Sequence, residues 1–213
     1  MILRLVALAI GYVFGIFQTG YIYGKLHGVD IRTQGSGNTG TTNTLRILGK
    51  KAGLIAFIGD CLKAIIPILI VKFAFADAFE GDIKVLELYA GLGAVLGHNY
   101  PFYLKFKGGK GIATTAGVAF VICPQAVPLC FGLFLLCLAF TRYVSLGSII
   151  MAALFIVQVW IFNAIDLLGI AEANILEVNI LAFVFGALAI FRHKDNIKRL
   201  LNGTENKLGQ KAK

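Results

Sequence analysis

The chain has 213 residues, of which 58% are hydrophobic and only 15% charged. A mean hydropathy of +0.81 excludes an ordinary soluble domain, in which about a quarter of the residues are charged. The net charge of +9 comes from basic residues between the apolar runs, without the aromatic and basic array that stacks nucleic-acid bases, so we expect no nucleic-acid partner. We predict an all-α fold, a polytopic membrane helical bundle in which residues 1–213 form a single integral membrane domain.

The N-terminal apolar run, Ile2–Tyr23, predicts a first membrane span that is retained and not cleaved as a signal peptide. It contains a GxxxG pattern, Gly11 and Gly15, which we interpret as ordinary close packing within the bundle. The polar segment Lys25–Lys51 follows and is rich in lysine and arginine, with Asp30 as its one acid. This charge bias predicts a cytoplasmic segment and an N-terminus outside.

Within that segment stands Gly-Ser-Gly-Asn-Thr-Gly-Thr-Thr-Asn, residues 35–43, with Arg46 soon after it. The glycines allow backbone N–H groups to converge, and the hydroxyls and amides add donors. A short helix over Thr41–Leu48, ended by Gly49, would point its N-terminus to the same place. These features predict an anion site, most naturally for phosphate; the alternative is a flexible polar loop. The candidate residues are Gly35, Ser36, Gly37, Asn38, Thr41, Asn43 and Arg46.

The second predicted span, Gly53–Phe75, contains Asp60 and Lys63 one helical turn apart. An acid inside a membrane span is a functional candidate, and the alternative is an ion pair that holds the helix in the bundle. The acidic segment Asp77–Lys84 is predicted outside. Val85–Gly97 is short and glycine-rich, which indicates a broken or tilted helix that faces the site.

The second polar loop ends in Gly-Gly-Lys-Gly directly before an apolar helix. A lysine among glycines at a helix N-terminus suits a phosphate, although the loop is not a Walker A motif because GxxxxGK[ST] does not occur. The loop's other lysines, Lys105 and Lys107, fit the lipid headgroup region. The candidate residues are His98, Gly108, Gly109, Lys110 and Gly111.

The next apolar stretch, Ile112–Phe140, is longer than one span requires and contains two prolines. We therefore predict two helices, Ile112–Ile122 and Gln125–Phe140. Two further spans follow, Val144–Asn163 and one that ends at Phe191. The bundle then has about seven transmembrane helices, some short or broken, with the N-terminus outside and the C-terminus cytoplasmic.

The third polar segment begins at Arg192 and continues through a basic tail. His193 and Asn196 are three residues apart, on one helical face if the last helix continues, and Gly203 is predicted to end that helix. The alternative is a solvated tail at the membrane surface. The four cysteines form neither a CxxC pair nor a Cys/His cluster, so we predict packing residues and no metal site.

Taken together, the three polar segments resemble the bacterial acyl-phosphate:glycerol-3-phosphate acyltransferases, and the resemblance runs the full length. The chain departs from the family pattern at Thr41, where an alanine is usual. The His-x4-Asp motif of other glycerol-phosphate acyltransferases is absent. The matching residues are 35–43 with Arg46, Gly97 and His98 through Pro101 to the Phe-Lys-Gly-Gly-Lys-Gly of 106–111, and 192–196 with Gly203 and Glu205.

The resemblance implies a multi-pass enzyme of the bacterial inner (plasma) membrane with its active site at the cytoplasmic face. Such an enzyme moves a fatty acyl group from acyl phosphate to the 1-hydroxyl of glycerol 3-phosphate, giving lysophosphatidic acid and phosphate in the first step of phospholipid synthesis. It uses neither acyl-CoA nor acyl carrier protein directly, and we expect no cofactor, no metal and no obligatory protein partner. The alternative class is an organic-phosphate transporter, although the chain shows no internal repeat.

Both implied substrates carry a phosphate, and the chain offers two cationic glycine-rich loops. We expect Ser36, Asn38, Thr41, Asn43 and Arg46 to build one side of the site, and Lys110 with the amides of 108–111 to build the other. Ser36, Arg46, Lys110 and His193 are the expected catalytic residues. The acyl chain is expected to enter sideways from the cytoplasmic leaflet.

Two roles are open for His193: it is the general base, with Asn196 as a positioning donor, or it only binds while a substrate phosphate oxygen takes the proton. We lean to the second. Glu205 is expected to orient Lys110 or Arg46 or to bind a glycerol hydroxyl. His98 either joins the site or only fixes its loop.

Overall fold

The computed structural model describes residues 1–79 and 81–210, and within them it contains helices and no strands. This confirms the predicted all-α class. The α-helices are α1 (Ile2–Gly15), α2 (Thr19–Leu26), α3 (Thr41–Phe75), α4 (Ile83–Asn99), α5 (Ile112–Ile122), α6 (Val127–Thr141), α7 (Val144–Ala164), α8 (Glu172–Arg192) and α9 (Lys194–Leu201).

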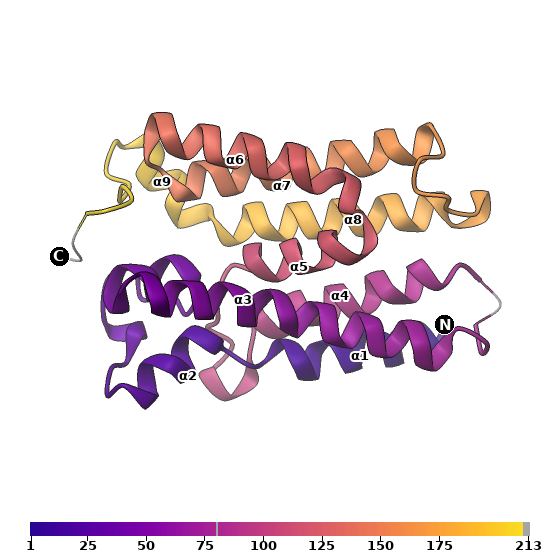
Figure 1. The fold of residues 1–213 in the computed structure, drawn as a ribbon, viewed down its shortest axis with the longest axis horizontal. Coiled ribbons are helices and arrows are strands. Elements are labelled where there is room, and N and C mark those ends of the chain that lie inside the picture. The colour runs from indigo at the N-terminus through magenta and orange to yellow at the C-terminus, as the bar shows by residue number, and fades with distance from the viewer. Residues whose placement is uncertain (80, 211–213) are drawn as a thin grey trace.

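Five stretches of the described chain are long and apolar enough to cross a membrane: Ile2–Leu26, Thr41–Phe75, Pro124–Thr141, Val144–Ala164 and Glu172–Arg192. Two shorter helices, α4 and α5, run within the same bundle (Figure 1). Met1 and α9 lie at opposite ends of it. The predicted membrane bundle with short helices is confirmed, while the count of seven spans and the sidedness stay predictions.

Two predicted breaks, at Gly49 and between the helices on either side of Pro124, are confirmed. Gly49 interrupts α3 with φ 86° and ψ −177°, a conformation that favours glycine, so a short helix precedes the long span. Farther along, α5 ends at Ile122, and a 3₁₀ turn over Pro124–Ala126 leads into α6. The proline ring and missing N–H explain why one continuous helix does not form there.

The first predicted span is wrong in one respect, because it is not one helix. It breaks after Gly15 and resumes at Thr19. A break inside a membrane protein leaves carbonyl groups that need donors from the protein. Lys63 supplies one to the carbonyl oxygen of Phe17 at 2.7 Å, and Gln18 in the break is fully buried. Contacts with distant residues therefore stabilise a helix break that the apolar sequence does not predict.

Close contact between α1 and α4 depends on glycines from both helices. A Cβ atom built on Gly11 would lie 1.8 Å from the carbonyl oxygen of Ala90, and one on Gly93 would lie 2.0 Å from that of Leu8. These distances involve backbone atoms, which cannot rotate away. The GxxxG pattern thus serves packing within the chain, as predicted.

Replacing Gly11 with leucine is expected to force α1 from α4 and to destabilise the protein by about 3 kcal/mol or more, because overpacking a tight contact is costly. The thermal midpoint of the detergent-solubilised protein measures the effect. Gly132→Leu is the matched control, since a Cβ atom there would meet nothing within 4 Å. Equal midpoints for both variants would contradict the packing role.

Candidate active site

A polar cavity of about 300 Å³ lies where the three polar segments meet. It is framed by the start of α3, the loop before α5, and the region from the end of α8 to residue 208. The predicted residues that line it are Ser36, Asn38, Thr41, Asn43, Arg46, His98, Lys110, Gly111, His193, Asn196 and Glu205. Gly35, Gly37, Gly108 and Gly109 are not among its lining residues.

Asn43 holds the first loop in shape. Its amide nitrogen contacts the carbonyl oxygens of Ile31, Gln34 and Asn38 at 2.8–3.2 Å, and its oxygen accepts from the N–H of Ser36 at 2.9 Å. The amide is therefore engaged by the loop itself. A Cβ atom on Gly35 would lie 2.4 Å from the same amide oxygen, so that glycine is required by the packing of the loop.

Other groups of this loop remain available to a ligand. The hydroxyl of Thr41 is buried with no hydrogen-bond partner in the described part of the chain. The guanidinium of Arg46 forms no ion pair there either, and both residues line the cavity. Asn38 reaches across to the second loop, where it donates to the carbonyl oxygen of Gly108 at 3.4 Å.

The expectation that the amides of Gly108 and Gly109 bind an anion is wrong. The N–H of Gly108 donates to Asn99 O at 3.1 Å, and that of Gly109 donates to His98 O at 3.0 Å, because the loop folds back on the end of α4. The carbonyl oxygens of both glycines accept from Arg192 at 2.9–3.2 Å. Both glycines are thus held between α4 and Arg192 and hold Lys110 in place.

A chain of side chains then orients Lys110. Its ammonium donates to Asn196 Oδ1 at 2.5 Å, and Asn196 Nδ2 donates to Glu205 Oε1 at 2.8 Å. Glu205 also accepts from Ser145 at 3.0 Å and pairs with Arg199 at 2.7 Å. Burial, opposed by the charge of Glu205, lowers the pKa of Lys110 to about 8.

His193 closes α8 and is buried against the cavity. Its Nδ1 lies 2.7 Å from the carbonyl oxygen of Ala189. A carbonyl only accepts, so Nδ1 carries the proton and Nε2 of the neutral ring carries a lone pair. Burial, and then the charge of Lys110, lower the pKa of His193 to about 4. The ring is therefore a neutral acceptor near pH 7.

Two residues that line the cavity, Ser145 and Arg199, were not predicted from the sequence. Asp60, a candidate in the sequence, lines it as well. Arg199 was hidden among the other basic residues of the tail, and Ser145 lies in an apolar span without any motif around it. Asp60 was noted as a pair with Lys63, and that ion pair is confirmed at 2.8 Å between two buried side chains.

A smaller polar cavity, of about 150 Å³, adjoins the first. It reaches toward Arg192 and Lys194 near the start of α9. Because the two cavities have a common wall, two anions would lie within reach of the same donors. The residues that line both are Ser36, Asn38, Lys110, Asn196 and Arg199.

On its other side the larger polar cavity meets an apolar one of about 380 Å³, formed by α3, α5, α6, α7 and α8. Phe57, Ile112 and Phe134 line both. Small side chains such as Ala116 and Ala152 leave the apolar space open. The site can therefore hold a molecule with an anionic head and a hydrocarbon tail.

The fold and these cavities define a membrane-embedded helical protein with a cavity lined by basic and polar side chains beside an apolar one. The family model described as glycerol-3-phosphate acyltransferase matches residues 5–203. The chain therefore belongs to the glycerol-3-phosphate acyltransferase family.

Curated relatives and solved structures agree with this assignment. A glycerol-3-phosphate acyltransferase of Clostridioides difficile (strain 630) is 43% identical over 95% of this chain and 94% of its own. One of Geobacter sulfurreducens is 40% identical over 97% and 98%. The crystal structure of PlsY (YgiH), an integral membrane glycerol 3-phosphate acyltransferase, in its glycerol 3-phosphate form, aligns with a TM-score of 0.83 at 38% identity over 97% of this chain and 96% of that one. Its lysophosphatidic acid form aligns with a TM-score of 0.78.

Proposed function

We propose that the protein transfers a fatty acyl group from acyl phosphate to the 1-hydroxyl of glycerol 3-phosphate, releasing lysophosphatidic acid and phosphate. The observation that carries this proposal is that three cavities, two polar and one apolar, adjoin one another. Two phosphates and one hydrocarbon chain are the parts that the two substrates bring together. Family membership favours this enzyme over an organic-phosphate transporter.

In the proposed reaction the hydroxyl oxygen attacks the acyl carbonyl carbon, and the bond from that carbon to the phosphate oxygen breaks. Phosphate leaves with the electron pair, and the hydroxyl proton passes to a phosphate oxygen. An acyl phosphate is a mixed anhydride with a good leaving group, so an acyl-enzyme is unnecessary. The protein aligns the two substrates, and Lys110 and Arg46 stabilise the charge on the leaving phosphate.

The position of the site fits a cytoplasmic active site at the inner membrane. The helix α9 and the start of α3, which contribute lining residues to the cavity, lie at the same end of the bundle (Figure 1). The connection between α7 and α8, which contains Asp166, lies at the opposite end with the N-terminus. Since cytoplasmic segments are enriched in lysine and arginine, we place the α9 end in the cytoplasm.

The test is to incubate the purified protein with acyl phosphate and glycerol 3-phosphate and to measure phosphate release and lysophosphatidic acid together. Release that requires both substrates, in equal amounts with the lipid product, supports the proposal. The same reaction with acyl-CoA as the donor is the comparison. Turnover with acyl-CoA alone, or phosphate release without lipid product, would refute it.

Filling the apolar cavity is expected to shorten the acyl chain that the enzyme accepts. Ala116→Phe places a ring where the proposed chain lies, and each methylene that loses its site forfeits about 0.8 kcal/mol. We expect kcat/KM with a long-chain acyl phosphate to fall at least roughly tenfold, and that with a short-chain donor to change little. Ala153→Phe, on an exposed position of α7 outside the cavities, is the control. Equal losses for both donors would contradict the assignment.

A further inference from the structure

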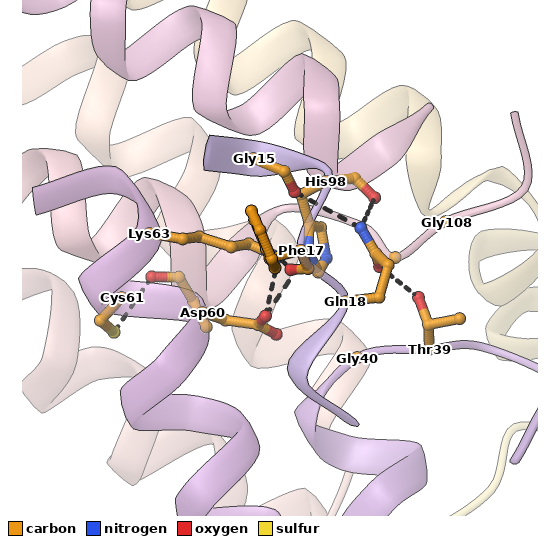
Figure 2. Close-up of polar contacts among 12 residues, drawn as sticks. Gly15, Phe17, Gln18, Thr39, Gly40, Asp60, Cys61, Lys63, His98 and Gly108 are labelled. Atoms are coloured by element: carbon orange, nitrogen blue, oxygen red, sulfur yellow. Dashed lines mark hydrogen bonds and ion pairs between the residues drawn. The ribbon is translucent and has the colours of Figure 1, made fainter. Parts of the chain in front are cut away.

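A buried charged cluster lies beside the polar cavity and includes groups that the proposed reaction does not use. Lys63 is 5% exposed and contacts three atoms: Phe17 O at 2.7 Å, Asp60 Oδ1 at 2.8 Å and His98 Nδ1 at 2.6 Å (Figure 2). An ammonium group has three N–H donors and no acceptor. Two of these contacts, to Phe17 O and His98 Nδ1, are hydrogen bonds, and the contact with Asp60 is an ion pair.

This arrangement fixes the state of the His98 ring. A carbonyl oxygen only accepts, so Lys63 donates to Phe17 O. The adjacent carboxylate of Asp60 favours the charged form of Lys63, and an ammonium group has no lone pair with which to accept from His98. Nδ1 of His98 must then accept, which leaves the ring neutral with its proton on Nε2. Nε2 of His98 is therefore a hydrogen-bond donor, whereas Nε2 of His193 is an acceptor.

The Nε2 atom of His98 lies against Gly109, in the loop before α5. A Cβ atom built on Gly109 would be 1.9 Å from it, and His98 lines the polar cavity. Among the described residues no hydrogen-bond partner of Nε2 is found. The donor is thus held against Gly109, the residue before Lys110, with no partner in the described part of the protein.

The backbone of the same histidine joins the two loops. Its carbonyl oxygen accepts from the N–H of Gly109 at 3.0 Å and from the amide of Gln18 at 3.1 Å. Gln18 in turn accepts from the hydroxyl of Thr39 in the first loop at 2.7 Å, and both of these side chains are buried (Figure 2). The backbone of His98 is therefore tied to both loops.

We propose that Lys63, fixed by Asp60, is a positioning residue that holds His98 in the Nε2–H tautomer and so offers this N–H to a phosphate oxygen in the cavity. The part that concerns the phosphate rests on the proposed function. The part that concerns the tautomer does not, because the three contacts of Lys63 exist without a substrate. The His98 tautomer can therefore be tested separately from the binding of phosphate.

The first experiment is nitrogen NMR of the isotope-labelled histidine rings in the purified protein near neutral pH, without substrate. The chain has 3 histidines, so His27→Gln and His98→Gln variants assign the signals. We expect an unprotonated Nδ1 and a protonated Nε2 for His98. If His98 is an imidazolium, or if its proton is on Nδ1, the proposal is overturned. This test needs no substitution at Asp60 or Lys63.

The second experiment removes the pair as a unit. Asp60→Asn with Lys63→Met avoids leaving a lone buried charge, which would unfold the protein. In the folded double variant we expect a mixture of His98 tautomers and a kcat lowered roughly tenfold or more, since a misplaced donor loses part of its 10²–10³-fold effect. In a His98→Ala background the same double change should cost little more, because the effects share one group.

A folded double variant that keeps the single tautomer or full turnover would show that the pair is only structural. Additive losses in the His98→Ala background would show the same. Should the double variant fail to fold, the tautomer of the unaltered protein still decides the proposal. A wild-type protein that shows the expected tautomer but does not use acyl phosphate would refute the proposed function and leave the tautomer assignment intact.

Discussion

Replacing Lys110 with methionine is expected to lower kcat/KM by about 10²–10³-fold, the loss typical of one group that stabilises charge in a transition state. Lys110 lines both polar cavities and is aimed by Asn196. In the proposed reaction it stabilises the charge that grows on the leaving phosphate. Lys107→Met in the same loop is the control, because Lys107 is exposed and lines neither cavity. A comparable loss in both variants would refute the specific role.

The pH profile of the unaltered enzyme provides an independent check on Lys110. Its pKa, lowered to about 8 by burial, means that the ammonium loses its proton as the pH rises through that value. Since kcat/KM reports the free enzyme, kcat/KM should fall above pH 8. Lys110→Arg should retain part of the activity and lack this alkaline limb, because a guanidinium stays protonated. A limb that persists in the arginine variant would belong to another group.

The parts of the structure that the sequence predicts are those governed by local chemistry. Gly49 needs a positive φ, and Pro124 cannot continue a helix, so the interruptions at both positions were visible as residue types. The polar segments were recognised because they have no hydrocarbon to bury in a chain that is otherwise apolar. Within these segments, the ionisable side chains of Lys110, Arg46 and His193 were recognised as candidates because they suit phosphate chemistry.

The parts that the sequence did not predict depend on contacts between distant segments. The break at residues 16–18 is stabilised by Lys63 and by the network of Gln18, and the surrounding residues are as apolar as those of an unbroken helix. The direction of the Gly108 and Gly109 amides is set by the end of α4 and by Arg192. Glycine allows many backbone directions, so its presence alone does not say where its N–H points.

His193 provides the second large effect, and its two proposed roles predict different results. A general base works best when its pKa lies near the working pH. Burial and the charge of Lys110 lower the pKa of His193 to about 4, which makes the free ring a weak base. Its Nε2 lone pair, fixed by the contact of Nδ1 with Ala189, is well suited to accept a hydrogen bond from the glycerol hydroxyl.

We therefore expect His193→Ala to lose about 10²-fold or more in kcat/KM, within the range of a general base or of an orienting contact. His193→Gln should keep much of the activity, because its amide oxygen accepts from the same hydroxyl while being unable to take the proton. Steady-state kinetics with both substrates varied measures the two variants, and their thermal midpoints serve as the folding control. If the glutamine variant is as inactive as the alanine variant although folded, His193 removes the proton itself and the phosphate oxygen does not.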